Sequence, residues 1–411
     1  MTREMRLALR NAGNIDPSSI EDYLAVGGYQ ALAKARATDP SELIQMLEKS
    51  GKLRGRGGAA FNTGLKWSSA FQVDSDEKYV ICNADEGEPG TYKDRTIMEN
   101  DPHTVIEGIL IAAYAIGAKD CIIYCRGEYQ QSIQLLENAI KQAQERGLCE
   151  GVRIQVVYGA GSYICGEETA LLESLEGRRG EPRLKPPFPT ISGYRQKPTV
   201  INNVETFATV PVIVEKGAEW FSAIGSPSYP GTKVFSLSGA VVHKGCFETP
   251  TDITLRELIY DFGGGLPEGH TLKAVQLGGS SCDFLSPEML DVQIDFDTML
   301  SVGASLGSGA VLVIDETHNI VDILVGIAEF FVHESCGKCI PCRLGSQQVA
   351  QTLKRLADGS GCEADLETLR ELAGYMKMSS FCPLGQSATT ALMSALKLFE
   401  DDFQAKLQPL I

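Results

Sequence analysis

The sequence has no excess of basic residues and no apolar run long enough to cross a membrane. Its 53 Asp and Glu residues outnumber 37 Lys and Arg residues, and the formal net charge is -16. This balance argues against nucleic-acid binding and against attachment to anionic lipid, because both need a basic surface. The most apolar long segment, Thr104–Ala118, contains Glu107 and is shorter than the roughly 20 residues of a membrane-spanning helix. We therefore expect no nucleic-acid partner and no direct membrane insertion.

An export signal and a second closely spaced cysteine pair are also missing. No signal peptide is apparent, so the 12 cysteines are expected in a reducing cytoplasm, where disulfides are rare. One stretch, "ESCGKCIPCRLG", places Cys336, Cys339 and Cys342 at C-x2-C-x2-C spacing. Structural zinc sites usually draw their ligands from two separated pairs, and no second C-x2-C follows in this sequence.

A fourth ligand is predicted in "SSFCPLGQ", where Cys382 precedes a proline. C-x2-C-x2-C with a remote Cys-Pro is typical of the thiolates that hold a [4Fe–4S] cluster. The spacing therefore predicts an iron–sulfur cluster on Cys336, Cys339, Cys342 and Cys382. A zinc site and a chance group of buried thiols are the alternatives at this point.

Hydrophobic patterns predict three kinds of structure along the 411 residues, which is long for one core. Alternating strands and helices from Lys78 to Tyr158 predict a parallel sheet covered by helices. From near Thr232, two strands, a short helix and a third strand have the order of a small ubiquitin-like β-grasp. From about Ile323 the pattern becomes helical, which places the cysteines in a C-terminal bundle. The fold class is thus α/β with a Rossmann-like domain, a β-grasp domain and a helical bundle, expected at residues 1–72 (glycine-loop segment), 73–230, 231–322 and 323–411.

A glycine loop, "RGRGGAAF" at Arg54–Phe61, contains the pattern G-x-G-x-x-A. The ordinary Rossmann interpretation is rejected because a helical pattern, not a strand, precedes the loop. Its glycines nevertheless let backbone N–H groups approach a phosphate closely, and basic residues add positive charge. The glycines are Gly55, Gly57 and Gly58, and the basic residues are Arg54, Arg56 and Lys66. A flexible turn is the alternative.

Two acidic loops follow predicted strands, "NADEGEPGTYKDR" and "AGSYICGEETALLESLEGRRGEPRLKPPFP". Because ligands bind at the carboxyl ends of parallel strands, both loops should line one crevice. Carboxylates there can hold ribose hydroxyls and repel a 2′-phosphate, which would favour NADH over NADPH; a solvated acidic surface is the alternative. The carboxylates of these two loops are Asp85, Glu86, Glu88, Glu167 and Glu168.

With these motifs in order along one chain, the sequence closely resembles the NADH-oxidising flavoprotein subunit of respiratory complex I. The same family includes subunits of soluble hydrogenases, formate dehydrogenases and electron-bifurcating enzymes. The likeness extends from about Asn11 to the last helix. It implies FMN in the crevice, NADH over the flavin, and a [4Fe–4S] cluster on the four cysteines. It further implies that the cofactors carry the chemistry, so no side-chain nucleophile or base is expected, and Glu88 and Glu168 position the nucleotide.

The resemblance also implies individual contacts. FMN contacts would be Gly55, Arg56, Lys66, Asn83, Asp85, Gly166, Glu167, Glu168, Ile201, Asn202, Asn203 and Thr206. Phe61 and Phe188 would hold the adenine, and Lys66, Glu88, Tyr163, Glu167 and Glu168 would lie near the ribose and nicotinamide. Gly57, Gly58, Glu86 and Gly87 complete the two cofactor loops. Three positions depart from many family members: Ala60 replaces a glycine, Ser69 a bulky residue, and Gly87 a serine or larger residue.

The expected function is NADH oxidation inside a multisubunit oxidoreductase, with single electrons leaving through the cluster. The resemblance implies further iron–sulfur partners, a thioredoxin-like [2Fe–2S] subunit and a larger multi-cluster subunit, with a cytoplasmic location that partners could bring to the membrane. One alternative is the same module in a soluble bifurcating, hydrogenase or formate dehydrogenase complex that couples NAD(H) to ferredoxin. Another is a non-catalytic iron–sulfur scaffold.

Overall fold

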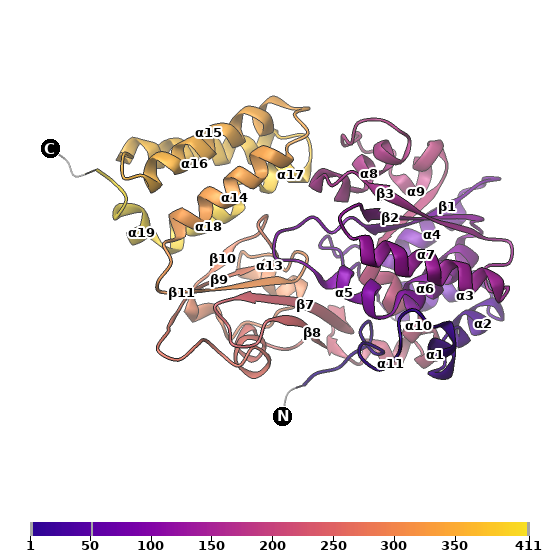
Figure 1. The fold of residues 1–411 in the computed structure, drawn as a ribbon. Coiled ribbons are helices and arrows are strands. Elements are labelled where there is room, and N and C mark those ends of the chain that lie inside the picture. Colours follow the sequence, from indigo (N-terminus) through magenta and orange to yellow (C-terminus); the bar gives the residue numbers. More distant parts are fainter. Residues whose placement is uncertain (1–2, 51, 409–411) are drawn as a thin grey trace.

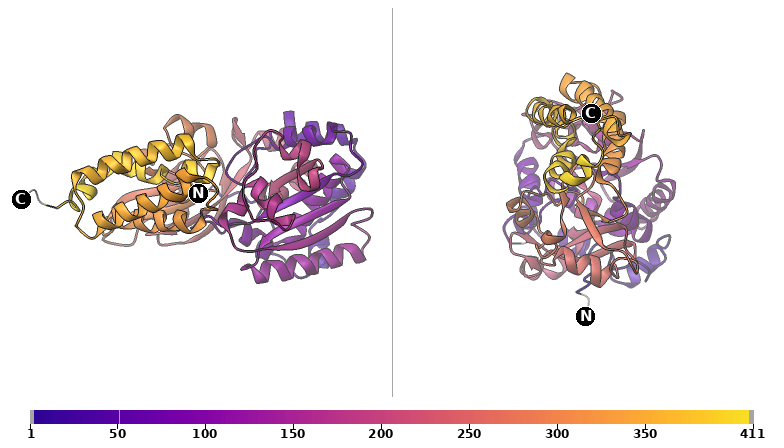
Figure 2. Two further views of the ribbon diagram at one scale, coloured as in Figure 1. Left: turned by 90° about the horizontal axis from the view of Figure 1, so that it is seen from above. Right: turned by 90° about the vertical axis from the view of Figure 1, so that its left-hand side faces the viewer.

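The computed structural model describes residues 3–50 and 52–408. Figures 1 and 2 show an elongated molecule, with a helix-covered sheet at one end and the C-terminal helices at the other. A second sheet lies beneath the C-terminal helices in Figure 1. The predicted class, a parallel α/β region followed by a small mixed sheet and a helical region, is confirmed.

The first sheet has four parallel strands in the order β3-β2-β1-β4. Its strands are β1 Tyr79–Ala84, β2 Asp120–Arg126, β3 Arg153–Gly159 and β4 Thr199–Asn203. The first three were predicted from their apolar runs. β4 was not, because "TVINN" is short and ends in two asparagines. It nevertheless pairs directly with β1, so the segment "INNVET" starts at the carboxyl edge of the sheet.

Helices cover both faces of this sheet, which explains why the central strands β1 and β2 are buried without alternation. Val80 and Cys82 pack on the side of α6 and α7, whereas Ile81 packs on the side of α8. The helices of this part are α1 Ile20–Ala25, α2 Gln30–Arg36, α3 Pro40–Gln45 with the π-turn η1 Met46–Ser50, α4 Thr63–Gln72, α5 Lys93–Asn100, α6 Pro102–Ile116, α7 Gln130–Glu145, η2 Tyr163–Gly166, α8 Glu168–Leu175, α9 Pro189–Ser192, η3 Tyr194–Gln196, α10 Val204–Lys216 and α11 Ala218–Ser222.

The second sheet has five strands in the order β10-β9-β11-β7-β8. β11 runs parallel to β7 and antiparallel to β9, which is the arrangement of a β-grasp. The predicted hairpin β7–β8 is confirmed, whereas the central strand β11 was missed. A small two-stranded ladder, β5 Gly225–Ser226 and β6 Tyr229–Pro230, precedes this region in the chain. The elements of the region itself are β7 Thr232–Gly239, β8 Gly245–Pro250, α12 Leu255–Glu257 with η4 Leu258–Phe262, β9 Leu272–Leu277, β10 Phe284–Leu285, η5 Pro287–Met289, α13 Phe296–Ser301 and β11 Ala310–Asp315.

The C-terminal helices pack side by side over one face of the second sheet (Figure 1). Their shared core contains Leu324, Leu353, Leu369 and Leu392, all essentially buried. These are helix positions that the 3.6-residue pattern places inward. The helices are α14 Ile320–Glu334, α15 Ile340–Ala357, α16 Glu363–Ser379, α17 Pro383–Ser387, α18 Thr390–Leu398 and α19 Glu400–Gln404.

Candidate functional site

The glycine loop connects the π-turn η1 to α4, so it does follow a helical segment, as the sequence indicated. Its two ends are joined, since Gly55 N–H donates to the Phe61 carbonyl at 2.8 Å. A Cβ atom at Gly57 would lie 3.0 Å from Asn203 Cβ, so this glycine allows the loop to touch the end of β4. Ala60 adopts a φ of 49°, a left-handed conformation that glycine accepts more easily than alanine. Alanine in place of glycine at position 60 therefore strains the backbone locally, while the Gly55–Phe61 hydrogen bond still closes the loop.

The two arginines of the loop are held away from the crevice. Arg54 pairs with Asp297 at 3.0 Å, and Arg56 is fully buried with its guanidinium 4.2 Å from the centre of the Tyr229 ring. Arg54 thus ties the loop to residues 228 and 297, and Arg56 donates to the Pro230 carbonyl, while Nε and Nη1 of its buried guanidinium find no acceptor among the described residues. The backbone N–H of Arg56 still lies at the loop and donates to Thr206 Oγ1 at 2.9 Å.

Lys66 is the cation of this region that does reach the strand ends. Its ammonium donates to the Ile201 carbonyl at 3.0 Å and pairs with Glu168 at 3.2 Å. Its Nζ also lies 5.9 Å from the centre of the Phe61 ring. Lys66 therefore joins the glycine-loop helix α4 to β4 and to α8.

Asparagines fix the carboxyl ends of β1 and β4. Asn83 Nδ2 donates to the Gly166 carbonyl at 2.8 Å, and Asn202 Oδ1 accepts from Trp67 Nε1 at 2.9 Å. The structure therefore gathers the glycine loop, the end of β1, η2 and the end of β4 at one edge of the sheet. This is the edge at which open α/β sheets bind ligands.

Asp85 stands at this edge with an unsatisfied acceptor. Its Oδ2 atom is buried and finds no hydrogen-bond donor among the described residues. Burial raises the pKa of Asp85 to about 7. A buried acceptor of this kind fits a ligand that brings its own hydroxyl or N–H donor.

The other two carboxylates of the first acidic loop have different partners. Glu86 accepts from the N–H groups of Asp94 and Arg95, at 2.8 and 3.1 Å, so its side chain caps α5 and is turned away from the predicted ribose site. Burial raises the pKa of Glu86 to about 7. Glu88 instead accepts from the Tyr163 hydroxyl at 2.5 Å and from Ser281, and burial raises its pKa. Only Glu88 of this pair lies beside a predicted nucleotide contact.

In the second acidic loop, lysines neutralise the two glutamates. Lys185 Nζ lies 2.8 Å from Glu167 Oε1 and 2.9 Å from Glu168 Oε1. Burial opposes the charge on Glu168, but Lys66 and Lys185 outweigh it and hold its pKa below the ordinary value. Glu167 also accepts from the N–H groups of Thr169 and Ala170 and so caps α8. The expected repulsion of a 2′-phosphate is therefore weaker than two free carboxylates would give.

Aromatic rings flank the open side of this edge. Phe61 and Phe188 remain 52% and 55% exposed, one on each of the two loops that border Lys66 and Lys185. Ser69, one of the three positions that depart from many family members, donates a hydrogen bond from Oγ to Thr190 Oγ1 at 3.0 Å. This bond links α4 to α9. A Cβ at Gly87 would come within 3.1 Å of the Tyr163 ring, so a larger residue there would displace Tyr163.

A buried charge network that the sequence did not predict lies below the crevice. Lys93 contacts Asp94 at 2.6 Å and Glu205 at 3.1 Å, and Lys233 of β7 contacts Glu205 at 2.7 Å. Burial lowers the pKa of Lys233 to about 8, whereas Asp94 and Glu205 overcome burial and raise that of Lys93. Asn203 also accepts from Lys93 at 3.1 Å. The sequence feature that could have indicated this network is a single lysine, Lys233, inside the apolar strand "TKVFSLSG".

The four predicted metal ligands meet in one small cavity between helix starts. Cys336 follows α14, Cys339 is the N-cap of α15, Cys342 lies in its first turn, and Cys382 is the N-cap of α17. Helix N-termini favour negative groups such as thiolates. The cavity is lined by Ile164, Pro182, Ser335, Cys336, Lys338, Cys339, Cys342, Phe381, Cys382 and Leu384.

The spacing of the ligands along the chain distinguishes a cluster from a single zinc ion. Structural zinc sites usually take two separated pairs, whereas C-x2-C-x2-C with a remote Cys-Pro is typical of a [4Fe–4S] cluster. The Cys342 and Cys339 sulfurs also have nearby polar groups, Ser335 Oγ at 3.3 Å and Phe381 N–H at 3.5 Å. The four cysteines gathered in one cavity therefore fit a polynuclear iron–sulfur cluster.

One segment of the chain borders both the crevice and the cysteine cavity. Tyr163, beside Glu88, donates its N–H to Glu334 at the end of α14, at 2.8 Å. The next residue, Ile164, lines the cysteine cavity. Further along, Pro182 O accepts from Lys338 at 2.7 Å, and Arg179 donates to the Cys336 carbonyl. Segment 163–187 is therefore a common wall of the two sites.

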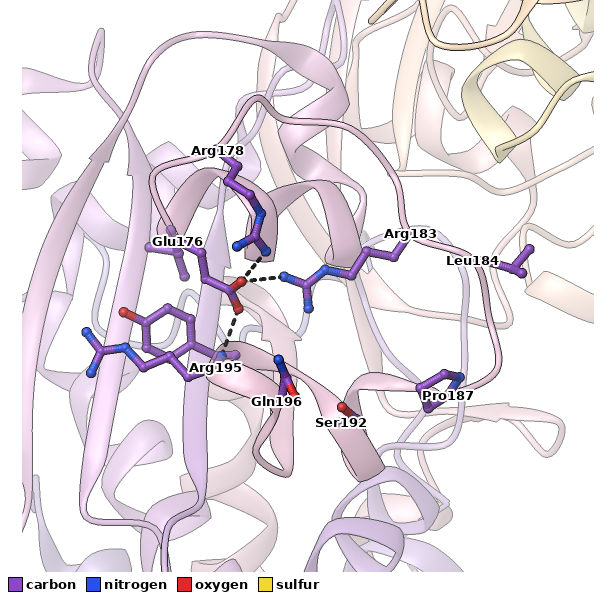
Figure 3. A pocket seen from close by; sticks show the side chains of 10 residues that line it. Glu176, Arg178, Arg183, Leu184, Pro187, Ser192, Arg195 and Gln196 are labelled. Carbon is purple, nitrogen blue, oxygen red and sulfur yellow. Dashed lines mark hydrogen bonds and ion pairs between the residues drawn. The ribbon is translucent and has the colours of Figure 1, made fainter.

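Figure 3 shows a hollow on the outer side of this wall, beside α8 and η3. Glu176 lies at its centre and binds Arg178, Arg183 at 2.8 Å, and the backbone N–H of Arg195 at 2.7 Å. These contacts fix the loop that carries Lys185 and Phe188. The hollow is lined by Leu175, Glu176, Arg178, Arg183, Leu184, Pro187, Ser192, Tyr194, Arg195 and Gln196.

No helix within residues 3–50 and 52–408 is long and apolar enough to span a bilayer. Residues 49–212 match the Nuo51 FMN-binding domain, and residues 322–406 match the NADH-ubiquinone oxidoreductase-F iron-sulfur binding region. These two matches cover the crevice and the cysteine cavity.

Relatives match over nearly the whole chain. The NADP-reducing hydrogenase subunit HndC of Solidesulfovibrio fructosivorans is 46% identical over 98% of this chain and 84% of its own length. An NADH-quinone oxidoreductase subunit of Rhizobium meliloti is 47% identical over 97% of each chain. A crystal structure of NAD+-reducing [NiFe]-hydrogenase superposes with a TM-score of 0.89 at 37% identity, covering 100% of this chain and 68% of the other. With fold, sites and relatives in agreement, the chain belongs to the family of FMN- and [4Fe–4S]-binding, NADH-oxidising flavoprotein subunits found in NADH-quinone oxidoreductases.

Proposed function

We propose that FMN lies between the glycine loop and the carboxyl ends of β1 and β4. Support comes from the closed loop, in which the N–H groups of Gly57 and Gly58 have no acceptor among the described residues, and from the buried, unpaired Oδ2 of Asp85. The proposed contacts are Gly55, Arg56 through its backbone, Gly57, Gly58, Lys66, Asn83, Asp85, Gly87, Gly166, Ile201, Asn202, Asn203 and Thr206. Glu86 acts indirectly, because it caps α5 behind Asp85.

The proposed nucleotide site lies on the open side of the same edge. Phe61 and Phe188 would enclose the adenine, since both rings are about half exposed. Glu88, oriented by Tyr163 and Ser281, and Glu168, held by two lysines, would meet the ribose and nicotinamide. Glu167 would contribute mainly as the cap of α8.

When bound, FMN supplies the ability to take two electrons as a hydride and release them singly. The chain's own part is to bind, orient and exclude water. Lys66 and the strand-end asparagines fix one side of the crevice, and the pair Glu88–Tyr163 fixes the other. Positioning of this kind can lower a barrier by several kcal/mol without any acid or base. Asp85, with a pKa of about 7, can hold a proton on its carboxyl group near neutral pH.

The common wall, segment 163–187, is the observation that carries the proposed electron path. Tyr163 borders the crevice and Ile164 borders the cysteine cavity, so adjacent residues separate the two cofactor sites. This placement supports transfer from the flavin to the cluster within one chain. It is harder to reconcile with a non-catalytic scaffold, which would need no crevice next to the cluster.

The test is whether NADH reduces the cluster in this chain alone. Protein loaded anaerobically with FMN and iron–sulfide should develop the electron paramagnetic resonance signal of a reduced cluster after NADH is added. The matched control is the same preparation after removal of FMN, which should stay silent. Equal cluster reduction without FMN, or none with it, would reject the proposed path.

We also propose that onward transfer goes to another iron–sulfur subunit in a larger complex, and that the chain works in the cytoplasm. Relatives from NADH-quinone oxidoreductases and from a hydrogenase match at nearly equal identity, so the acceptor is decided by the partner. A thioredoxin-like [2Fe–2S] subunit and a multi-cluster subunit are the proposed partners. Anaerobic copurification followed by mass spectrometry identifies them. We retain 1–72, 73–230, 231–322 and 323–411 as proposed units.

A further inference from the structure

Three potential metal ligands meet at one end of the second sheet, far from the cysteines in sequence. Asp315 is the last residue of β11, Glu316 follows it, and His270 precedes β9. The pairing of β11 with β9 shifts register between Ile314 and Asp315, so the regular ladder is interrupted there. At this irregularity two consecutive carboxylates come near the same histidine.

The distances suit coordination better than hydrogen bonding. His270 Nδ1 lies 3.2 Å from Asp315 Oδ2 and 3.4 Å from Glu316 Oε1, and the three ligand atoms lie within 4.8 Å of one another. Charge-assisted N–H···O bonds are shorter, about 2.7–2.9 Å. In a tetrahedral site with bonds of about 2.0–2.1 Å, neighbouring ligand atoms are about 3.3–3.4 Å apart.

The two carboxylates are already oriented by their other oxygen atoms. Asp315 Oδ1 accepts from Thr317 Oγ1 at 2.6 Å and contacts His318 Nδ1 at 2.7 Å. Glu316 Oε2 accepts from the Thr271 N–H at 2.7 Å. The side chain of Asp315 is only 9% exposed, yet its Oδ2 accepts no hydrogen bond from the residues described here. Asp315 Oδ2, oriented through the bonds of Oδ1, thus faces the His270 ring nitrogen at the protein surface.

We propose that His270, Asp315 and Glu316 form a zinc-binding site, with water as the fourth ligand. One imidazole and two carboxylates suit zinc, whereas magnesium and calcium prefer six or more oxygen ligands. His270 is 37% exposed, so the open position faces solvent. Thr317, His318 and Thr271 are positioning residues that hold the carboxylates.

The site would brace the turn that leads into the cysteine-bearing helices. Residues 315–319 connect β11 to α14, which ends beside Cys336. The carbonyl of His318 accepts from Lys273, and Lys273 also pairs with Asp402 of α19 at 2.7 Å. A zinc ion at this turn would therefore stabilise the junction between the second sheet and the helical region, independently of the FMN site.

The test uses tag-free protein loaded with FMN and the cluster, titrated anaerobically with zinc chloride by calorimetry. We expect one site with a dissociation constant below about 10 µM. His270→Ala should weaken binding at least tenfold, and Thr317→Val, which loosens Asp315, about tenfold. The matched control is His243→Ala, because His243 is also an exposed histidine of the same sheet region but lies outside the cluster.

Zinc-edge X-ray absorption separates this site from the cysteines. Nitrogen and oxygen ligands at about 2.0–2.1 Å support the proposal, whereas sulfur at about 2.3 Å overturns it. Wild-type protein that binds no zinc in this range, or a His270→Ala protein that binds as tightly as wild type, also overturns it. Circular dichroism and NADH-dependent flavin bleaching show that each variant is folded, because none of these residues touches the crevice.

Discussion

The nucleotide crevice and the cysteine cavity differ in how the chain builds them. The cavity takes its four proposed ligands from the starts of α15 and α17 and the residues just before them. The crevice instead needs the glycine loop, the ends of β1 and β4, and η2, which come together only through the sheet. A site built from helix starts shows its chemistry in local spacing, whereas a site built from strand ends depends on long-range pairing.

The two regions also differ in what stabilises them. Buried ionisable groups surround the crevice, among them Asp85, Glu88 and Lys93. The cysteine cavity is bordered mainly by apolar side chains and the thiols, with Ser335 and Lys338 as its other polar lining. Stability around the crevice should therefore depend on pH and on charge pairing, and stability around the cavity on the metal cluster.

The largest expected effect comes from separating the two sites. Cys382→Ser removes one cluster ligand and the link between α15 and α17, so the cluster should be damaged or lost. Electron transfer to the natural partner should fall at least about 100-fold, whereas NADH-dependent bleaching of FMN stays within about twofold, because the crevice contacts are untouched. Stopped-flow bleaching and partner reduction are measured side by side. A variant that retains full transfer to its partner would show that Cys382 is not a ligand.

Breaking the buried network should show how strongly the crevice depends on charge pairing. Lys93→Met leaves Asp94 buried without a cation, while Glu205 keeps Lys233, and the unpaired charge costs about 3–5 kcal/mol of unfolding free energy. The control is Arg95→Ala on the same helix, where an exposed pair with Glu99 is lost at a cost below about 0.5 kcal/mol. Urea denaturation of FMN-free protein measures both. Equal losses in the two variants would contradict the network's role.

Asp85 in the crevice should contribute to the pH dependence of the stability of FMN-free protein. Asp85 has a pKa of about 7 when folded, against an ordinary value of 3.8. The unfolded chain therefore loses this proton first, and the unfolding free energy should fall as pH rises from about 4 to 7, by on the order of 2 kcal/mol. Glu86 acts in the same direction. Denaturation at pH 5 and pH 7.5 measures the decrease, and Asp85→Asn should reduce it. An unchanged decrease in that variant would assign the effect elsewhere.

The charge of Glu168 in the crevice should influence the preference for NADH over NADPH. Glu168→Gln keeps the size of the side chain but leaves Lys66 and Lys185 with one fewer negative partner. The ratio of NADPH to NADH turnover should rise about fivefold, roughly 1 kcal/mol. Glu168 is the better position for this test than Glu167, whose loss would also uncap α8. A fall in the ratio would contradict a role for this charge.

The smallest expected effect lies at the cysteine cavity. Ser335→Ala removes the hydroxyl 3.3 Å from the Cys342 sulfur, and donors to cluster sulfurs raise the reduction potential. The midpoint potential should therefore drop by tens of mV, on the order of 1 kcal/mol or less. Ser387→Ala is the control, because that hydroxyl donates to the Pro383 carbonyl instead. Redox titration followed by electron paramagnetic resonance measures both variants.

The sequence predicted the cysteine ligands and the apolar strands because both depend on local patterns. It missed β4 and β11, which are short and become strands through pairing with β1 and with β7 and β9. It did not predict the pairing of Arg54 with Asp297, since a loop arginine near glycines has the same sequence whatever partner the fold brings to it. The network around Lys93 was invisible for a related reason, because its charges resemble solvated ones until the fold buries them.

The common wall at 163–187 has a consequence for exchanging parts between homologues. The FMN-binding and iron–sulfur regions look separable in sequence, yet Glu334 and Lys338 of the second bond directly to Tyr163 and Pro182 of the first. A chimera that receives residues 322–406 of a relative would place foreign partners against this wall. Chimeras that also receive residues 163–187 of the same relative should assemble their clusters more completely. Junctions for exchanging the iron–sulfur region should therefore include both ends of segment 163–187.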